Sequence, residues 1–115
     1  MKKILGLLVV FFAFCVSSFA YDGFTQVRAS HILVKSESRA NEIKEAVEDG
    51  GSFEYYAKLY STCPSGQDGG DLGYFGRGQM VPQFEEVAFL TPVGEISDPV
   101  QTQFGWHLIK VVARR

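Results

Sequence analysis

Two apolar segments rich in β-branched residues stand at the ends of the chain that follows residue 20, with helical patterns between them. The first segment is VRASHILV, from Val27 to Val34, and the last runs from Trp106 to Ala113. Both are typical of strands, and the shorter segments Leu72 to Phe75 and Ile96 to Val100 predict two more. Because strands flank the helices, the two ends of the chain can meet in one sheet. We therefore expect an α+β fold with an antiparallel sheet and the helices packed around it.

Apolar residues recur at helical spacing in three places between the outer strands. The first series ends at Gly50 and Gly51, a C-cap signal, and the second follows Ser52, a typical N-cap residue. The third begins at Pro82, which suits a first helical turn because its missing N–H needs no partner there. The apolar positions of the three series are Ala40, Ile43, Ala46 and Val47, then Phe53, Tyr56, Ala57 and Tyr60, then Phe84, Val87 and Ala88.

The first 20 residues have the order of a secretory signal peptide. Lys2 and Lys3 are basic, the run from Ile4 to Val16 carries no charge, and Ser18 and Ala20 supply the small residues of a cleavage site. The apolar run is shorter than the about 20 residues of a membrane-spanning helix. We expect cleavage after Ala20, with an uncleaved anchor as the alternative. The predicted parts are a signal peptide over 1–20, a short lead over 21–26 and one domain over 27–115.

These features predict an exported protein, which would be periplasmic in a bacterium with two membranes and would have no stable membrane association after cleavage. The chain has a formal net charge of −2, and loss of Lys2 and Lys3 makes it more acidic. No basic cluster is present, which argues against nucleic-acid binding. Cys15 leaves with the signal, so Cys63 has no partner for an internal disulfide. Its thiol is then buried, paired with another molecule, or functional.

A glycine-rich segment follows the second helical series. Residues 61–78 contain six glycines, one proline and few aliphatic residues. Long segments of this kind in small domains are usually functional or disordered. Cys63 lies within it, in the sequence STCPSG.

Candidate chemical residues lie far apart in the sequence. His31 is inside the first strand and His107 starts the last, while Met80 and Phe84 are four residues apart and share a face at the start of the third helix. Taken singly, each histidine is more often a core residue whose nitrogens are hydrogen-bonded. Cys63 alone would more often be a small residue without a chemical role, and Met80 and Phe84 would more often be packed in the core.

Four segments together resemble the parvulin family of prolyl isomerases. The resemblance runs from about Val27 to Ala113, and one short segment alone would be weak evidence for it. The segments are ASHILV (29–34), STCPSG (61–66), GGDLGYFGRGQMVPQFEEVAF (69–89) and TQFGWHLIKV (102–111).

The resemblance implies a single parvulin-like domain, with a four-stranded antiparallel sheet surrounded by about four helices, and peptidyl-prolyl isomerase activity. It implies that His31 and His107 form the floor of the active site, hydrogen-bonded to hydroxyls such as that of Thr102, and that Cys63 faces the substrate amide. It implies no metal and no organic cofactor. The residues that would hold the substrate proline are Leu72, Met80 and Phe84, with Phe104 at the rim.

The expected substrates are proline-containing polypeptides, unfolded or partly folded, and the small domain suggests a monomer. Some parvulins require phosphorylated Ser or Thr before the proline and carry a basic loop after the first strand. Here that link holds only Lys35 and Arg39 beside Glu37, a poor phosphate clamp. We therefore expect no phosphate requirement, and a bulky apolar residue or no strong preference before the proline.

Three alternatives stay open. The domain could be a chaperone-like module that binds extended apolar segments with little catalysis. It could be a thiol hydrolase that uses Cys63 with a histidine, although no cysteine-protease signature is visible. A metal site made by His31, Cys63 and His107 is the third, although their spacing matches no metal motif.

Overall fold

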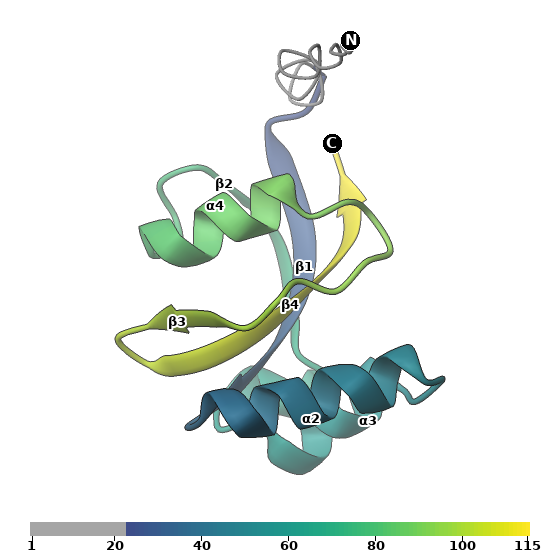
Figure 1. Ribbon diagram of the computed structural model, residues 1–115. Coiled ribbons are helices and arrows are strands. Elements are labelled where there is room, and N and C mark those ends of the chain that lie inside the picture. Colours follow the sequence, from purple (N-terminus) through teal and green to yellow (C-terminus); the bar gives the residue numbers. More distant parts are fainter. Residues whose placement is uncertain (1–22) are drawn as a thin grey trace, which may run out of the picture.

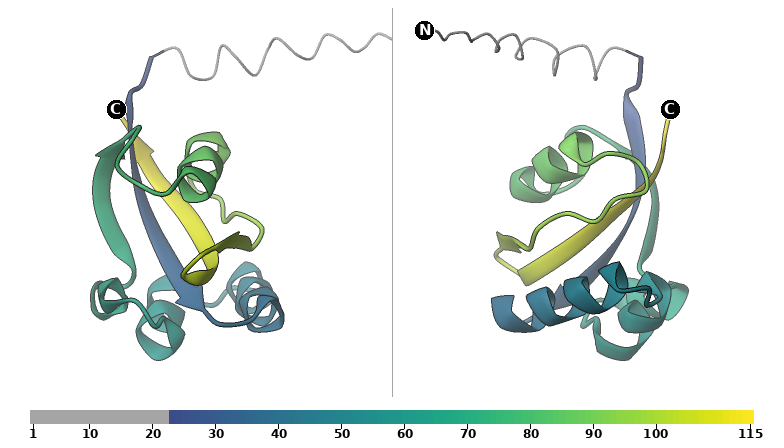
Figure 2. Two further views of the ribbon diagram at one scale, coloured as in Figure 1. Left: turned by 90° about the vertical axis from the view of Figure 1, so that its left-hand side faces the viewer. Right: turned by 45° about the vertical axis from the view of Figure 1, so that its right-hand side comes forward.

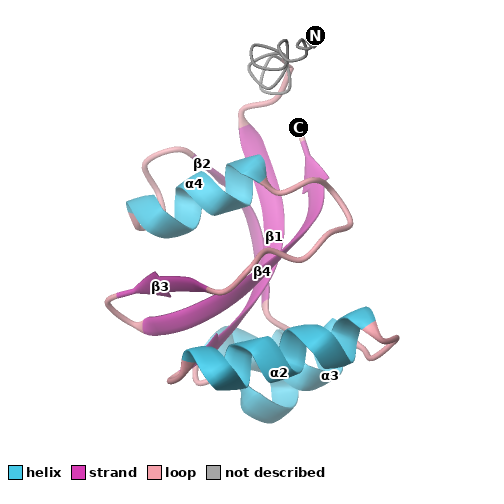
Figure 3. Ribbon diagram, viewed as in Figure 1, coloured by secondary structure: helices cyan, strands magenta, loops and turns pink. Residues whose placement is uncertain are grey.

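The computed structural model describes residues 23–115, so the predicted signal peptide lies outside the described residues. Within that range, no helix is long and apolar enough to cross a membrane. The elements, shown in Figures 1 and 3, are β1 (Gln26–Val34), α2 (Glu37–Glu48), α3 (Phe53–Tyr60), the 3₁₀ helix η2 (Pro64–Asp68), β2 (Asp71–Gly76), α4 (Pro82–Leu90), β3 (Val100–Thr102) and β4 (Gly105–Arg114).

Local capping fixes the starts of the helices, at Ser52 as predicted and at Ser36 in addition. The Ser36 side chain accepts a hydrogen bond from the Arg39 N–H at the start of α2, and Ser52 accepts one from the Tyr55 N–H at the start of α3. Each bond satisfies a backbone donor that the helix itself leaves unpaired. Pro82 occupies the first turn of α4, as predicted.

The four strands form one antiparallel sheet in the order β2-β1-β4-β3. The first and last strands are therefore central neighbours, whereas the sequence had indicated only that they could meet in one sheet. Their register pairs His31 with Ile109 and Leu33 with His107. Because side chains alternate across a strand, His31 and His107 lie diagonally on the same face of the sheet.

Two predictions about the elements were wrong in detail. About four helices were expected, and residues 23–115 hold three α-helices, with η2 as a further 3₁₀ segment. A strand was expected from Ile96 to Val100, but β3 begins only at Val100 and Ile96 makes an isolated bridge to Lys110. Pro99 accounts for the second difference, because proline has no N–H to donate to a strand ladder.

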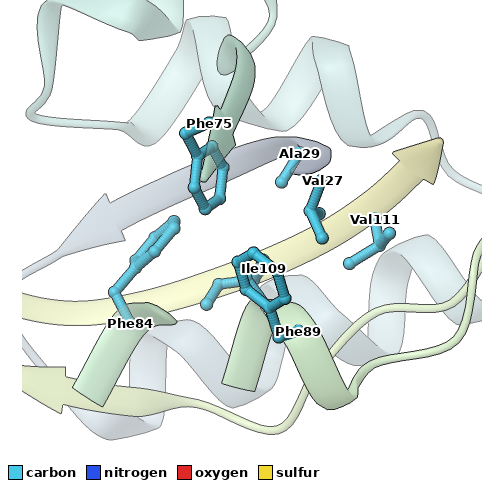
Figure 4. Packing of buried hydrophobic residues seen from close by; sticks show 8 residues of the cluster. Val27, Ala29, Phe75, Phe84, Phe89, Ile109 and Val111 are labelled. Atoms are coloured by element: carbon cyan, nitrogen blue, oxygen red, sulfur yellow. The ribbon is translucent and has the colours of Figure 1, made fainter. Parts of the chain in front are cut away.

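Helices cover both faces of the sheet. Figure 2 shows α4 on one side of β1 and β4, with α2 and α3 gathered where β1 ends. Phe84 and Phe89 of α4 point toward Val27, Phe75 and Ile109 of the strands (Figure 4). The other cluster packs the α2 and α3 side chains against the opposite face of β1 and β4, and consists of Ile32, Val34, Ala40, Ile43, Phe53, Ala57 and Leu108.

Candidate active site

A pocket of about 450 Å³ opens on the α4 side of the sheet. No Asp, Glu, Lys or Arg side chain lines it, and most of its wall is apolar. Of the predicted site residues, only Thr102 is not in the lining, and it contacts His107 from behind. The lining residues are His31, Leu33, Thr62, Cys63, Pro64, Leu72, Gln79, Met80, Val81, Phe84, Phe104 and His107.

The two histidines contact each other at the base of the pocket. Their Nδ1 atoms are 3.0 Å apart, and their rings stack with centroids 5.2 Å apart and planes 20° apart. Both side chains are almost completely buried, with exposed fractions of 5% for His31 and 4% for His107. The antiparallel register of β1 and β4 causes this contact, since it places residues 76 positions apart on neighbouring strands.

Hydrogen bonds extend from the histidine pair in both directions. On one side, His31 Nε2 lies 3.1 Å from Ser65 Oγ, and the Ser65 hydroxyl donates to Cys63 Sγ at 3.3 Å. On the other side, His107 Nε2 lies 2.7 Å from Thr102 Oγ1, which accepts from the Phe104 N–H at 3.1 Å. One continuous chain of hydrogen bonds thus connects the thiol to the β3–β4 turn.

With both imidazoles neutral, one arrangement of protons lets both hydroxyls of the hydrogen-bond network, those of Ser65 and Thr102, donate. Thr102 donates to His107 Nε2, and the His107 Nδ1–H donates to His31 Nδ1. His31 then carries its proton on Nε2, donates to Ser65, and leaves the Ser65 hydroxyl free to donate to Cys63. In the reversed arrangement the Thr102 hydroxyl accepts from two N–H groups and donates to no member of the chain.

Burial keeps both histidines neutral. Desolvation, and second the charge of His107, lower the pKa of His31 to about 4. Desolvation also lowers the pKa of His107 below its ordinary value. Because a cation is costly in an apolar interior, the histidines are uncharged hydrogen-bonding groups at neutral pH. The apolar wall of the pocket is therefore next to a polar but uncharged floor.

Phe84 joins the floor to the wall. Its ring meets His31 edge-on at 5.5 Å and 82°, and meets His107 at 5.3 Å and 78°. Only 3% of its surface is exposed. Met80, just before α4, and Leu72, in β2, are partly buried against the same cluster and line the pocket beside it. Phe104 is 63% exposed and stands at the mouth.

The glycine-rich segment is held against β1 rather than extending into solvent. The Thr62 N–H donates to the Leu33 carbonyl at 2.8 Å, and the His31 N–H donates to the Gly70 carbonyl at 2.9 Å. Gly70 has φ +89°, and a Cβ there would collide with the His31 carbonyl oxygen. A glycine is thus required where the segment passes β1. These contacts position Cys63 and Ser65 over the histidines.

Ser65 was not predicted from the sequence, although it connects His31 to Cys63. Its position within STCPSG was the available signal. Gln79, Thr62 and Leu33 also line the pocket without having been predicted. Among residues 23–115, no group of three or more His, Cys, Asp or Glu side chains is arranged to hold a metal ion.

Comparison with known proteins connects this geometry to a family. Residues 19–115 match the family model described as the PPIC-type PPIase domain. The chain is 53% identical over 93 residues to the foldase protein PrsA of Geobacillus kaustophilus, covering 79% of this chain and 33% of that protein. It is 47% identical over 91 residues to PrsA of Bacillus subtilis, covering 78% and 31%. The chain therefore spans about a third of the length of these curated relatives.

Solved structures show the same relationship. The crystal structure of a peptidylprolyl isomerase, PrsA of Bacillus anthracis, superposes with a TM-score of 0.78 at 42% identity, covering 90% of this chain and 47% of that one. The solution structure of NmPin, the parvulin of Nitrosopumilus maritimus, gives a TM-score of 0.72 at 41% identity and covers 77% of this chain and 97% of that one.

Proposed function

The chain belongs to the family of PPIC-type PPIase domains, and we propose that it is a peptidyl-prolyl cis/trans isomerase acting on proline-containing polypeptides. The observation that carries this proposal is the uncharged pocket in which Leu72, Met80 and Phe84 face a floor of two neutral histidines. A proline ring is apolar and compact, while the amide that precedes it is polar. The pocket offers both surfaces side by side.

The reaction requires no bond cleavage. Its barrier is the loss of amide resonance, about 18–20 kcal/mol for an ordinary peptide bond. A catalyst must bind the twisted amide more tightly than either planar form, and each factor of ten in rate requires about 1.4 kcal/mol of that difference. A dry site with oriented hydrogen-bonding groups can supply it, because such groups need not reorganise as the amide charge changes.

The proposed roles of the residues follow from this requirement. Leu72, Met80 and Phe84 hold the proline ring, and the exposed ring of Phe104 covers it at the rim. Cys63 faces the rotating amide from the glycine-rich segment. His31, His107 and Thr102, linked through Ser65, keep that polar side oriented and uncharged. Support comes from the hydrogen-bond chain, in which both hydroxyls have an acceptor.

We propose no requirement for phosphate before the proline. No charged side chain lines the pocket, and of the two cations in the β1–α2 region, Arg39 is already engaged. Its Nε lies 3.3 Å from a Glu42 carboxylate oxygen, and its guanidinium covers the Tyr60 ring at 4.7 Å. A phosphate clamp normally uses several free Arg or Lys donors. A bulky apolar residue before the proline, or no strong preference at that position, suits this site better.

The signal-like first 20 residues support export, with residues 21–26 as a lead and 27–115 as the isomerase domain. The proposed substrates are then unfolded or partly folded exported proteins, and the domain acts as a monomer.

Exchange NMR on an unphosphorylated Xaa-Pro peptide, with catalytic amounts of the chain, tests the activity. Faster cis/trans exchange with the peptide intact is the expected result. Binding without faster exchange would instead support a chaperone-like module that holds apolar segments. Appearance of cleaved peptide would support a thiol hydrolase.

A further inference from the structure

Two further hollows of the surface adjoin the candidate active site in succession, because each shares lining residues with the one before it. Thr62 lines both the proline pocket and a second hollow at the β1–α2 junction, which includes Lys35 and Ser36. Arg39 and Tyr60 line that second hollow and also a third, between α2 and α3, which reaches Tyr56. We name the second and third hollows together the α2–α3 groove.

The far end of the α2–α3 groove has an aromatic surface. Tyr60 and Tyr56 stack with centroids 6.2 Å apart and planes 6° apart, and Tyr55 meets Tyr56 edge-on at 5.2 Å. Tyr60, which lines the groove, is 37% exposed, while Tyr55 and Leu59, which lie on α3 outside the groove lining, are 58% and 54% exposed. Neighbouring exposed aromatic and aliphatic side chains on a small domain commonly mark a site of interaction.

The surface is also held in place before anything binds. Arg39 covers one face of the Tyr60 ring at 4.7 Å and is itself paired with Glu42. Stacking and cation–π contact restrict the rotation of these rings, so a ligand need not immobilise them. Thr62 uses both its N–H and its hydroxyl on the Leu33 carbonyl and has no donor left for a ligand. At Thr62 a ligand is therefore held by apolar contact, while Lys35 and Ser36 add polar groups to the lining of the second hollow.

We infer that the α2–α3 groove binds the part of the polypeptide substrate that flanks the isomerised proline, through aromatic or aliphatic side chains. This inference rests on the proposed isomerase function and extends it to a substrate class, namely chains with a bulky apolar residue a few positions from the proline. The continuity through Thr62 favours this occupant, because a polypeptide seated in the pocket must leave it along the surface. Figures 1 and 2 show α2 and α3 together at the end of β1.

The dimensions agree with an extended substrate. Tyr56 and Tyr60 are separated by one helical turn, about 6 Å along α3, which is about two residues of an extended chain.

Three unphosphorylated peptides test the inference on the full chain. One is a tetrapeptide that contains only the Xaa-Pro unit. The second adds about eight residues with two phenylalanines before the proline, and the third adds the same residues after it. We expect one of the extended peptides to have a kcat/KM about tenfold above the tetrapeptide. Tyr60→Ser should remove most of that gain and leave the tetrapeptide rate unchanged.

Leu90→Ser is the matched control, because Leu90 is similarly exposed, at 53%, but lies at the end of α4 outside all three hollows. Leu90→Ser should change neither the rate for the tetrapeptide nor the rate for the faster extended peptide. Equal rates for all three peptides with the unchanged chain would overturn the groove, as would a Tyr60→Ser variant that slows the tetrapeptide equally. Self-association that Tyr60→Ser abolishes would assign the surface to a second copy of the chain and would also overturn it.

A binding measurement separates this inference from the activity itself. Fluorescence anisotropy follows labelled versions of both extended peptides in which alanine replaces the proline. Tyr60-dependent binding of one of them without any isomerisation of the tetrapeptide would retain the groove and reject the isomerase. Isomerisation of the tetrapeptide without Tyr60-dependent binding of either peptide would retain the isomerase and reject the groove.

Discussion

At the scale of residues, the candidate site depends on keeping polar side chains neutral within an apolar surround. His31 and His107 are nearly fully buried, and the hydrogen-bond chain from Thr102 to Cys63 gives each ring nitrogen a partner. A protonated histidine has an N–H on both ring nitrogens, so protonation of either ring would make His107 Nε2 a donor toward Thr102 and lose that arrangement. The resulting floor can interact with a rotating amide without presenting a charge to it.

Met80→Ala should lower kcat/KM for an Xaa-Pro peptide about tenfold, equivalent to about 1.4 kcal/mol, because the proline pocket loses a wall. Met80 is only partly buried, so thermal unfolding should show the fold retained. Exchange NMR measures the rate, and Val93→Ala, at an exposed apolar position outside the pocket, serves as the control. An unchanged rate would contradict the assignment of Met80 to the proline pocket.

Cys63→Ser and Cys63→Ala should each reduce the isomerisation rate several-fold without abolishing it. No covalent step is needed, so the thiol contributes only as a polar surface beside the amide. The same exchange measurement, with circular dichroism to verify folding, checks this. Complete loss of activity in both folded variants would indicate a nucleophilic role for the thiol.

At the scale of elements, the glycine-rich segment acts as part of the sheet's surface. Its backbone bonds to Leu33 and His31 of β1 place η2 and the start of β2 beside the histidines. Gly70 makes this approach possible, because its backbone passes directly against the His31 carbonyl. The position of Cys63 over the pocket is thus a consequence of how closely two backbones approach.

Gly70→Ala should destabilise the fold by more than about 2 kcal/mol, since it adds a backbone collision to the strain of a positive φ. Gly73→Ala is a matched control, because Gly73 has φ +71° but a Cβ there would meet nothing within 4 Å. It should cost only about 1 kcal/mol. Urea unfolding of both variants measures the difference, and equal losses would show that the approach at Gly70 can relax.

At the scale of the whole molecule, the two faces of the one sheet have different structural roles. Its α4 face contains the apolar cluster that continues into the candidate active site, and its other face packs α2 and α3. Because β1 and β4 are the central strands, the histidines lie in the middle of the sheet rather than on an edge. Site geometry and global stability are therefore coupled.

That coupling predicts a loss of stability in mild acid. The unfolded histidines take up protons near pH 6.5, while His31 in the folded chain resists protonation until about pH 4. The free energy of unfolding should therefore fall as the pH drops from about 6.5 toward 4, by about 3 kcal/mol for His31, with His107 adding to it in the same direction.

Urea unfolding between pH 7 and pH 5 measures this dependence, above the range in which carboxylates titrate. In the His31→Asn variant the free energy of unfolding should depend less on pH than in the unchanged chain, because a group with a lowered pKa has been removed. A slope that is unaffected by the substitution would show that His31 does not carry the effect.

Much of the architecture could be predicted because it depends on local patterns. Strand and helix positions, the cap at Ser52 and the family resemblance are all contained in short runs of residues. The strand predicted from Ile96 to Val100 was wrong because Pro99 cannot donate to a ladder, a local fact that outweighs β-branched composition. The roles assigned to Leu72, Met80, Phe84 and Phe104 stay predictions, although all four line one pocket.

The sequence by itself determined the α+β class, the possibility that the two end strands share one sheet, and the family. Only the tertiary structure decided that Ser65 connects Cys63 to His31, that the histidines share one hydrogen bond, and that Thr62 of the pocket also lines a neighbouring hollow with Tyr60. The physical reason is distance. Periodicity and composition describe neighbours along the chain, whereas these contacts join residues that become neighbours only through strand register and the close passage of one backbone over another.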